Sequence, residues 1–73
     1  MAKKFEYEIV ERVAVLSTNG EESKELNRIS FQGREPKYDL RTWRRDENGD
    51  KMLKGITLTE EELQALKDAL NAR

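Results

Sequence analysis

The sequence contains no cysteine and no histidine, and it has one proline and one tryptophan among its 73 residues. Without cysteine, the chain forms no disulfide and no thiolate metal site. Without histidine, it lacks the commonest metal ligand and the commonest general base. Short chains bury little surface and usually need a disulfide, a metal or a partner subunit for stability. We therefore expect one domain over residues 1–73 that pairs with a second copy.

Long apolar runs are also missing. Residues 1–4 lead into an alternating segment instead of an apolar block, so the sequence predicts no signal peptide. No run approaches the roughly 18 apolar residues of a membrane span. Together with the lack of cysteine, this favours a cytoplasmic protein without a membrane partner.

The residue patterns of catalysis are absent as well. Ser17, Ser23 and Ser30 have no histidine to activate them. The glycine-rich phosphate-binding patterns are missing, and the turn DENGD at 46–50 does not have EF-hand spacing. A carboxylate pair for glycoside hydrolysis is compatible with the residue types, but so small a domain offers little room for the deep cleft. The sequence predicts no enzyme, no cofactor, no metal and no small-molecule substrate.

Charge is plentiful but unevenly distributed. Charged residues make up 40% of the chain, and the net charge is −1. Residues 24–54 carry nine basic and six acidic residues, a net of +3, whereas 1–23 and 55–73 each have a net of −2. The overall charge argues against a nucleic-acid partner, but a basic middle between acidic ends can form one positive surface.

Alternation and turn residues predict four strands and a helix. A change of phase near 10–12 predicts a bulge in the first strand, and Gly55 in the fourth indicates a bulge or a close backbone approach. Thr59 followed by Glu62 is a capping box. The predicted fold is α+β, a four-stranded antiparallel sheet followed by one C-terminal helix (ββββα), with strands at 4–17, 24–32, 37–45 and 51–58, hairpin turns at Asn19-Gly20 and Asn48-Gly49, and a helix to about 72.

The helix carries an apolar stripe of Leu63, Leu66 and Leu70. Residues three and four apart lie on one side of a helix, so these leucines must be covered. The sequence alone leaves open whether they pack on this chain's own sheet or on that of a partner.

The segment KYDLRTWRR at 37–45 places the tryptophan among basic residues. In an extended strand, Tyr38 and Leu40 share one face, which we interpret as the core side, and Trp43 lies on the other. Basic side chains neutralise phosphates and flat rings stack on unpaired bases. The face of Trp43 is therefore a candidate site for single-stranded nucleic acid.

Other interpretations of that face remain open. Its charges can simply be solvated while Trp43 covers a core edge or a dimer seam. The alternative function is a protein–protein adaptor, in which the same basic face docks an acidic partner. An RNA-preferring binder is a third possibility.

The order of the motifs resembles that of a known family. DLRTW at 39–43, KGITLT at 54–59 and EELQALKDAL at 61–70 are similar to segments of positive cofactor four, a family of transcriptional coactivators. With KELNRISF at 24–31 and EPKYDLRTW at 35–43, roughly the whole chain resembles the small bacterial YdbC-like branch. The most specific parts are D-[IL]-R followed by an aromatic, and K-G-I-[ST]-L before a helix.

The resemblance implies a homodimer that binds single-stranded DNA with little sequence preference on its strand faces, without catalysis, in transcription, replication or repair. Carried onto this sequence, Arg41 contacts phosphate and Trp43 stacks on a base, so that Trp43→Ala weakens binding by about 1–3 kcal/mol. Taken together, the expected nucleic-acid-binding residues are Lys24, Phe31, Arg34, Lys37, Arg41, Trp43, Arg45 and Lys54.

Overall fold

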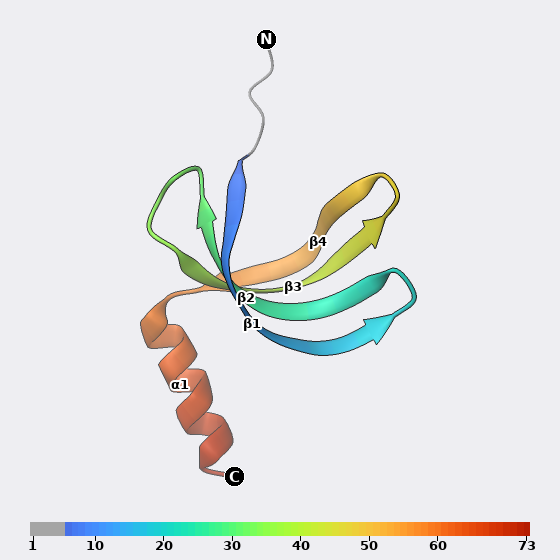
Figure 1. Cartoon of the computed structure of the whole chain (residues 1–73). Coiled ribbons are helices and arrows are strands. Elements are labelled where there is room, and N and C mark those ends of the chain that lie inside the picture. Colours follow the sequence, from blue (N-terminus) through green and yellow to red (C-terminus); the bar gives the residue numbers. More distant parts are fainter. Residues whose placement is uncertain (1–5) are drawn as a thin grey trace.

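The structure is a computed structural model that describes residues 6–73 as a four-stranded sheet followed by a helix (Figure 1). All neighbouring strands are antiparallel and follow the chain order β1-β2-β3-β4. The predicted ββββα fold is confirmed, although Phe5, expected in the first strand, lies outside the described residues. The elements are β1 (Tyr7–Asn19), β2 (Glu22–Phe31), β3 (Lys37–Asp46), β4 (Gly49–Leu58) and α1 (Glu60–Asn71).

The two predicted hairpin turns are displaced by one residue, and the first lies one residue later than predicted because Asn19 still belongs to β1. In the turn after β2, Gln32 and Gly33 have positive φ angles of 52° and 74°. The N–H of Arg34 donates to the carbonyl of Phe31 at 3.0 Å, which closes a β-turn. Positive φ angles at both central residues are typical of the type I′ turn found in β-hairpins. The turn between β3 and β4 lies one residue earlier than predicted, because Gly49 already begins β4.

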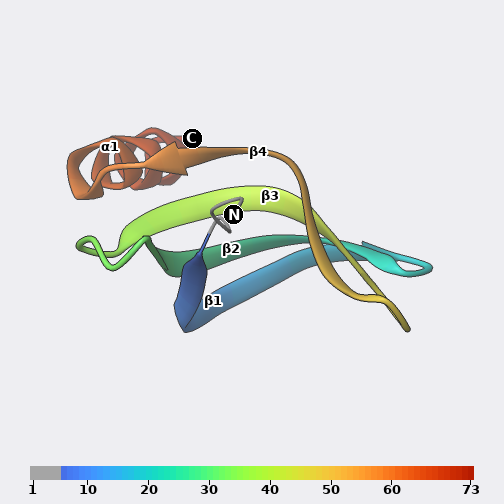
Figure 2. The same ribbon diagram turned by 90° about the horizontal axis from the view of Figure 1, so that it is seen from above.

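β1 is an irregular edge strand. Its register against β2 shifts three times, with an extra residue near Val10, near Val13 and near Leu16. The shift near Val10 was predicted from the sequence, and the other two were not. Each extra residue bends the strand and increases its twist, and β1 turns sharply near its start (Figures 1 and 2).

We call the face of Trp43 the inner face and the face of Tyr38 and Leu40 the outer face. All buried residues of the described chain lie on the inner face, namely Glu25, Asn27, Ile29, Asp39 and Trp43. The prediction that Tyr38 and Leu40 mark the core side is therefore wrong for the single chain, where both are half-buried. The inner face is the covered one because the sheet curls toward it. The start of β1 thereby brings the ring of Tyr7 against Trp43.

α1 begins as predicted but covers little of the sheet. The N–H of Glu62 donates to the Thr59 hydroxyl at 3.1 Å, and the N–H of Thr59 donates to the Glu62 carboxylate at 2.9 Å. The helix leaves the end of β4 and extends away from the sheet (Figure 1), and none of its residues is buried. Leu66 and Leu70 of its apolar stripe are 42% and 62% exposed, so residues 6–73 leave most of the stripe uncovered. Within residues 6–73, no helix is long and apolar enough to cross a bilayer.

Gly55 allows an unusually close approach between β3 and β4. It lies opposite Arg41, next to a register shift in this pair of strands. A Cβ atom at Gly55 would lie 1.9 Å from the Cβ of Arg41 and 2.7 Å from the carbonyl oxygen of Leu40, so no other residue fits. The bulge and the close approach predicted at this glycine are both confirmed.

Candidate nucleic-acid interface

The inner face gathers three aromatic side chains. Tyr7 lies opposite Phe31 across β1 and β2, and both are half-buried. The ring centroids of Tyr7 and Trp43 are 5.6 Å apart, with a tilt of 53° between the planes. Tyr7 comes to lie beside Phe31 through a register that depends on the bulges of β1.

Trp43 forms the floor of the inner face and is 0% exposed. The guanidinium of Arg45 lies over its ring, 5.1 Å from the centroid. A stacking role, as the resemblance implies, needs an accessible ring, whereas Arg45 and the curled sheet cover Trp43 in the single chain. Its indole N–H is buried and has no hydrogen-bond partner in the part of the chain that the structure describes.

Arg45 is held in place by carboxylates. Its two terminal nitrogens donate to the two oxygens of Glu25, with 3.1 Å between Nη2 and Oε1. Its Nε lies 3.4 Å from Oδ2 of Asp50. Glu25 is buried and also accepts hydrogen bonds from Ser23 and Asn27. The positive charge of Arg45 is therefore offset within the protein.

The surroundings of Glu25 change its titration. Burial alone would raise the pKa of this carboxyl, but three side-chain hydrogen bonds outweigh it, with the largest effect from Arg45. The pKa of Glu25 falls from an ordinary value of 4.5 to about 2. Because the folded pKa lies below the unfolded one, ionised Glu25 stabilises the fold above pH 4.5, and this contribution is lost as the pH falls toward 2.

We expect Glu25→Gln to remove on the order of 3 kcal/mol of unfolding free energy at neutral pH, since one pKa unit corresponds to about 1.4 kcal/mol. The difference from the wild type should shrink as the pH falls from 4.5 to 2, when wild-type Glu25 becomes protonated. Urea unfolding of both proteins over a pH series measures this difference in unfolding free energy. Glu61→Gln, at an exposed helix position, is the control for loss of one charge. A difference that stays constant with pH would contradict the prediction.

Arg41 is paired with Asp39 inside the D-L-R motif. Its Nε and Nη2 donate to the two oxygens of Asp39, each at 2.6 Å, and Nη1 donates to the carbonyl of Leu53 at 3.3 Å. Asp39 is completely buried. The two residues share a face because they are two positions apart in a strand. The guanidinium expected to contact phosphate therefore already binds a carboxylate of the protein.

The other predicted cations are exposed but lie in different places. Within residues 6–73, none of them has a carboxylate at ion-pair distance. Lys37 lies opposite Ile29 on the inner face, and Arg34 belongs to the turn after β2. Lys24 and Lys54 instead line a cleft of about 420 Å³ that also includes the outer-face residue Leu40. The structure thus separates these two lysines from the predicted face of Trp43.

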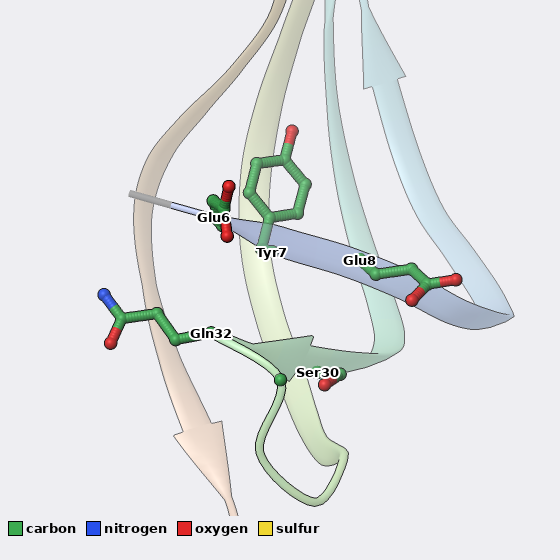
Figure 3. A pocket seen from close by; sticks show the side chains of 6 residues that line it. Glu6, Tyr7, Glu8, Ser30 and Gln32 are labelled. Carbon is green, nitrogen blue, oxygen red and sulfur yellow. The ribbon is translucent and has the colours of Figure 1, made fainter. Parts of the chain in front are cut away.

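A second cleft lies beside the turn after β2. It has a volume of about 410 Å³, and Figure 3 shows Glu6, just before β1, and Tyr7 and Glu8 on β1 above Ser30 and Gln32. Its two glutamates would repel phosphate. The described residues contain no group of three or more side chains that could hold a metal ion.

Comparison with known proteins identifies the family. An uncharacterized protein of Treponema pallidum (strain Nichols) is 48% identical over 69 residues, which cover 93% of this chain and 79% of that protein. Residues 18–69 match the sequence profile described as Transcriptional Coactivator p15 (PC4). The matched segment of this chain includes the DLR and KGI motifs. The resemblance found in the sequence is confirmed, and the chain belongs to the PC4 family, whose general role is DNA binding.

Proposed function

We propose that this protein binds single-stranded DNA with little sequence preference, and that the strand lies along the inner face. Membership of the PC4 family supports a DNA-binding role. The observation that carries the proposal is that the half-buried Tyr7 and Phe31 lie on one curved face with Lys37, an exposed cation without a carboxylate at ion-pair distance among residues 6–73. Unpaired bases have free faces for stacking, whereas the bases of a duplex do not. The cellular role is in transcription, replication or repair.

In this proposal, the two ends of the inner face contact the strand differently. At the end near the turn, Phe31 supplies a stacking surface, and Lys37 and Arg34 neutralise phosphates. Toward the opposite end, Arg12 shares Glu25 with Arg45, with 3.6 Å between its Nη1 and Oε1 of Glu25, so the charges of this cluster are largely offset within the protein. Arg41 contributes mainly to structure because Asp39 occupies its guanidinium.

We expect a labelled 20-nucleotide oligo-dT to bind more tightly than a duplex of equal length, with an affinity that falls as salt increases. Lys37→Ala should reduce the slope of log K against log salt by about 0.7, the value for one phosphate contact on a single strand. Fluorescence anisotropy at several salt concentrations measures both quantities. Lys54→Ala, on the other side of the sheet, is the contrasting variant and should leave the slope unchanged.

Three results would change this proposal. Equal slopes for the wild type and Lys37→Ala, with a smaller slope for Lys54→Ala, would move the strand to the outer face. Tighter binding of oligo-U than of oligo-dT would indicate an RNA binder. No binding of any oligonucleotide at low salt would favour the protein–protein adaptor.

We further propose that the protein works as a homodimer whose seam includes the outer face and α1. Only two apolar residues, Ile29 and Trp43, are buried within the described chain. So small a core seldom holds a domain together alone. In this proposed seam, Ile56 on β4 and Leu66 and Leu70 on α1 remain 42–62% exposed. A second copy would cover such a surface.

We expect Leu70→Glu to shift the protein from dimer to monomer and to lower its melting temperature, because a charge would enter the proposed seam. Sedimentation equilibrium over a range of protein concentrations measures the change. Ala65→Glu places the same charge on the side of α1 away from the leucine stripe and should have little effect. A wild-type protein that stays monomeric at high concentration would exclude the dimer.

A further inference from the structure

We infer that Arg45 presents the flat surface on which a base stacks at the centre of the inner face, with Trp43 as its support. This inference rests on the proposed binding of single-stranded DNA. It assigns to Arg45 a role different from the phosphate contact expected from the sequence, and it separates the stacking function from the buried indole.

Exposure decides which of the two side chains a nucleotide meets. Trp43 is 0% exposed, whereas 28% of the Arg45 side chain is accessible. The Arg45 guanidinium lies over the indole, 5.1 Å from the ring centroid. A base that reaches this point therefore contacts Arg45 first. Guanidinium groups are planar and weakly hydrated, and they are known stacking partners of unpaired bases.

The guanidinium is fixed before any ligand arrives. Both terminal nitrogens donate to Glu25, Nη1 also donates to Ser23 at 3.3 Å, and Nε faces Asp50. A long side chain normally loses conformational freedom on binding, and here that freedom is already restricted. Glu25 is therefore a positioning residue, which sets the orientation of the stacking surface without contacting the nucleic acid.

The same contacts argue against phosphate neutralisation by Arg45. Glu25 and Asp50 together offset its charge, so Arg45 contributes little net attraction for an anion. Its neighbour Arg44 provides a matched comparison. Arg44 is exposed, lies on the other side of β3 and pairs with Glu22 at 2.7 Å.

The test compares two labelled ligands of equal length and charge, a 20-nucleotide oligo-dT and a 20-unit chain of abasic deoxyribose phosphates. Only oligo-dT can stack, so the ratio of the two affinities measures the contribution of the bases. Arg45→Lys keeps the charge and loses the plane, whereas Arg45→Gln keeps a planar group and loses the charge. Arg44→Lys is the control, and circular dichroism establishes that each variant is folded.

We expect Arg45→Lys to lower the preference for oligo-dT about five- to tenfold, in the range of one stacked base. Its salt slope should stay unchanged, Arg45→Gln should retain more of the preference, and Arg44→Lys should behave as the wild type. Arg45→Lys with the wild-type preference would overturn the inference, as would variants that weaken both ligands equally. A wild-type protein that binds neither ligand would instead remove the proposed function itself.

Discussion

Replacing Trp43 with alanine is expected to lower the free energy of unfolding by about 3–5 kcal/mol, the usual range when a large buried aromatic is deleted. Natural domains have a total of only about 5–15 kcal/mol, so much of this short chain would unfold at room temperature. The effect exceeds the roughly 1–3 kcal/mol of binding energy expected for an exposed stacking ring. The cause is burial, because Trp43 and Ile29 are the only fully buried apolar residues among residues 6–73.

Urea unfolding followed by far-ultraviolet circular dichroism tests this prediction, since the variant has no tryptophan left to fluoresce. Protein concentration must be the same throughout, because a dimer becomes more stable with concentration. Trp43→Phe is the control and should lose much less stability, since it keeps an aromatic ring against Tyr7. A Trp43→Ala protein with the wild-type urea midpoint and no affinity for DNA would show that the indole acts as an exposed stacking surface.

Replacing Arg41 with methionine is expected to cost a similar amount, about 3–5 kcal/mol, because the buried carboxylate of Asp39 loses its counter-charge. The double variant Asp39→Leu with Arg41→Met removes both charges. It should recover most of the loss, since apolar residues often replace a buried ion pair without penalty. The double-mutant cycle thus separates the cost of an unpaired charge from the contribution of the pair itself.

The control for this cycle is Arg44→Met. Arg44 forms its ion pair with Glu22 in solvent, and exposed pairs contribute about 0–1 kcal/mol. Urea midpoints at constant protein concentration measure all of these variants. If Arg41→Met keeps its stability and loses affinity for single-stranded DNA, Arg41 contacts phosphate as the family resemblance implies, and the pairing with Asp39 is secondary.

These two predictions affect how binding data on this protein are interpreted. Both residues belong to the motif that the family resemblance assigns to DNA contact, and both are integral to the inner face. Loss of DNA binding in their alanine variants would therefore not show which surface binds DNA, because the variants would also be less stable. Exposed residues such as Lys37, and conservative changes such as Arg45→Lys, locate it more directly.

The local features of the fold were predictable from the sequence because local interactions determine them. The capping box at Thr59 and Glu62 depends on residues three positions apart. Strand alternation placed Arg41 and Trp43 on the same face, and the structure agrees. Gly55 indicated a bulge or a close approach, because a glycine inside a strand often marks one of these two features.

The candidate site was only partly predictable. Alternation tells which side chains share a face, but it does not tell which face becomes covered. The bulges near Val13 and Leu16 give no clear signal in the sequence. They contribute to the curl that covers Trp43 and turn the predicted solvent face into the interior of the single chain.

The sequence by itself determined the order of strands and helix, the position of the helix start and the family to which the chain belongs. All of these depend on neighbouring residues or on the spacing of motifs. Only the tertiary structure decided that Arg45 covers Trp43 and binds Glu25, twenty positions away in the chain. It also decided that Lys24 and Lys54 meet in a separate cleft. Contacts between distant residues depend on strand register and sheet curvature, which no single segment of the sequence contains.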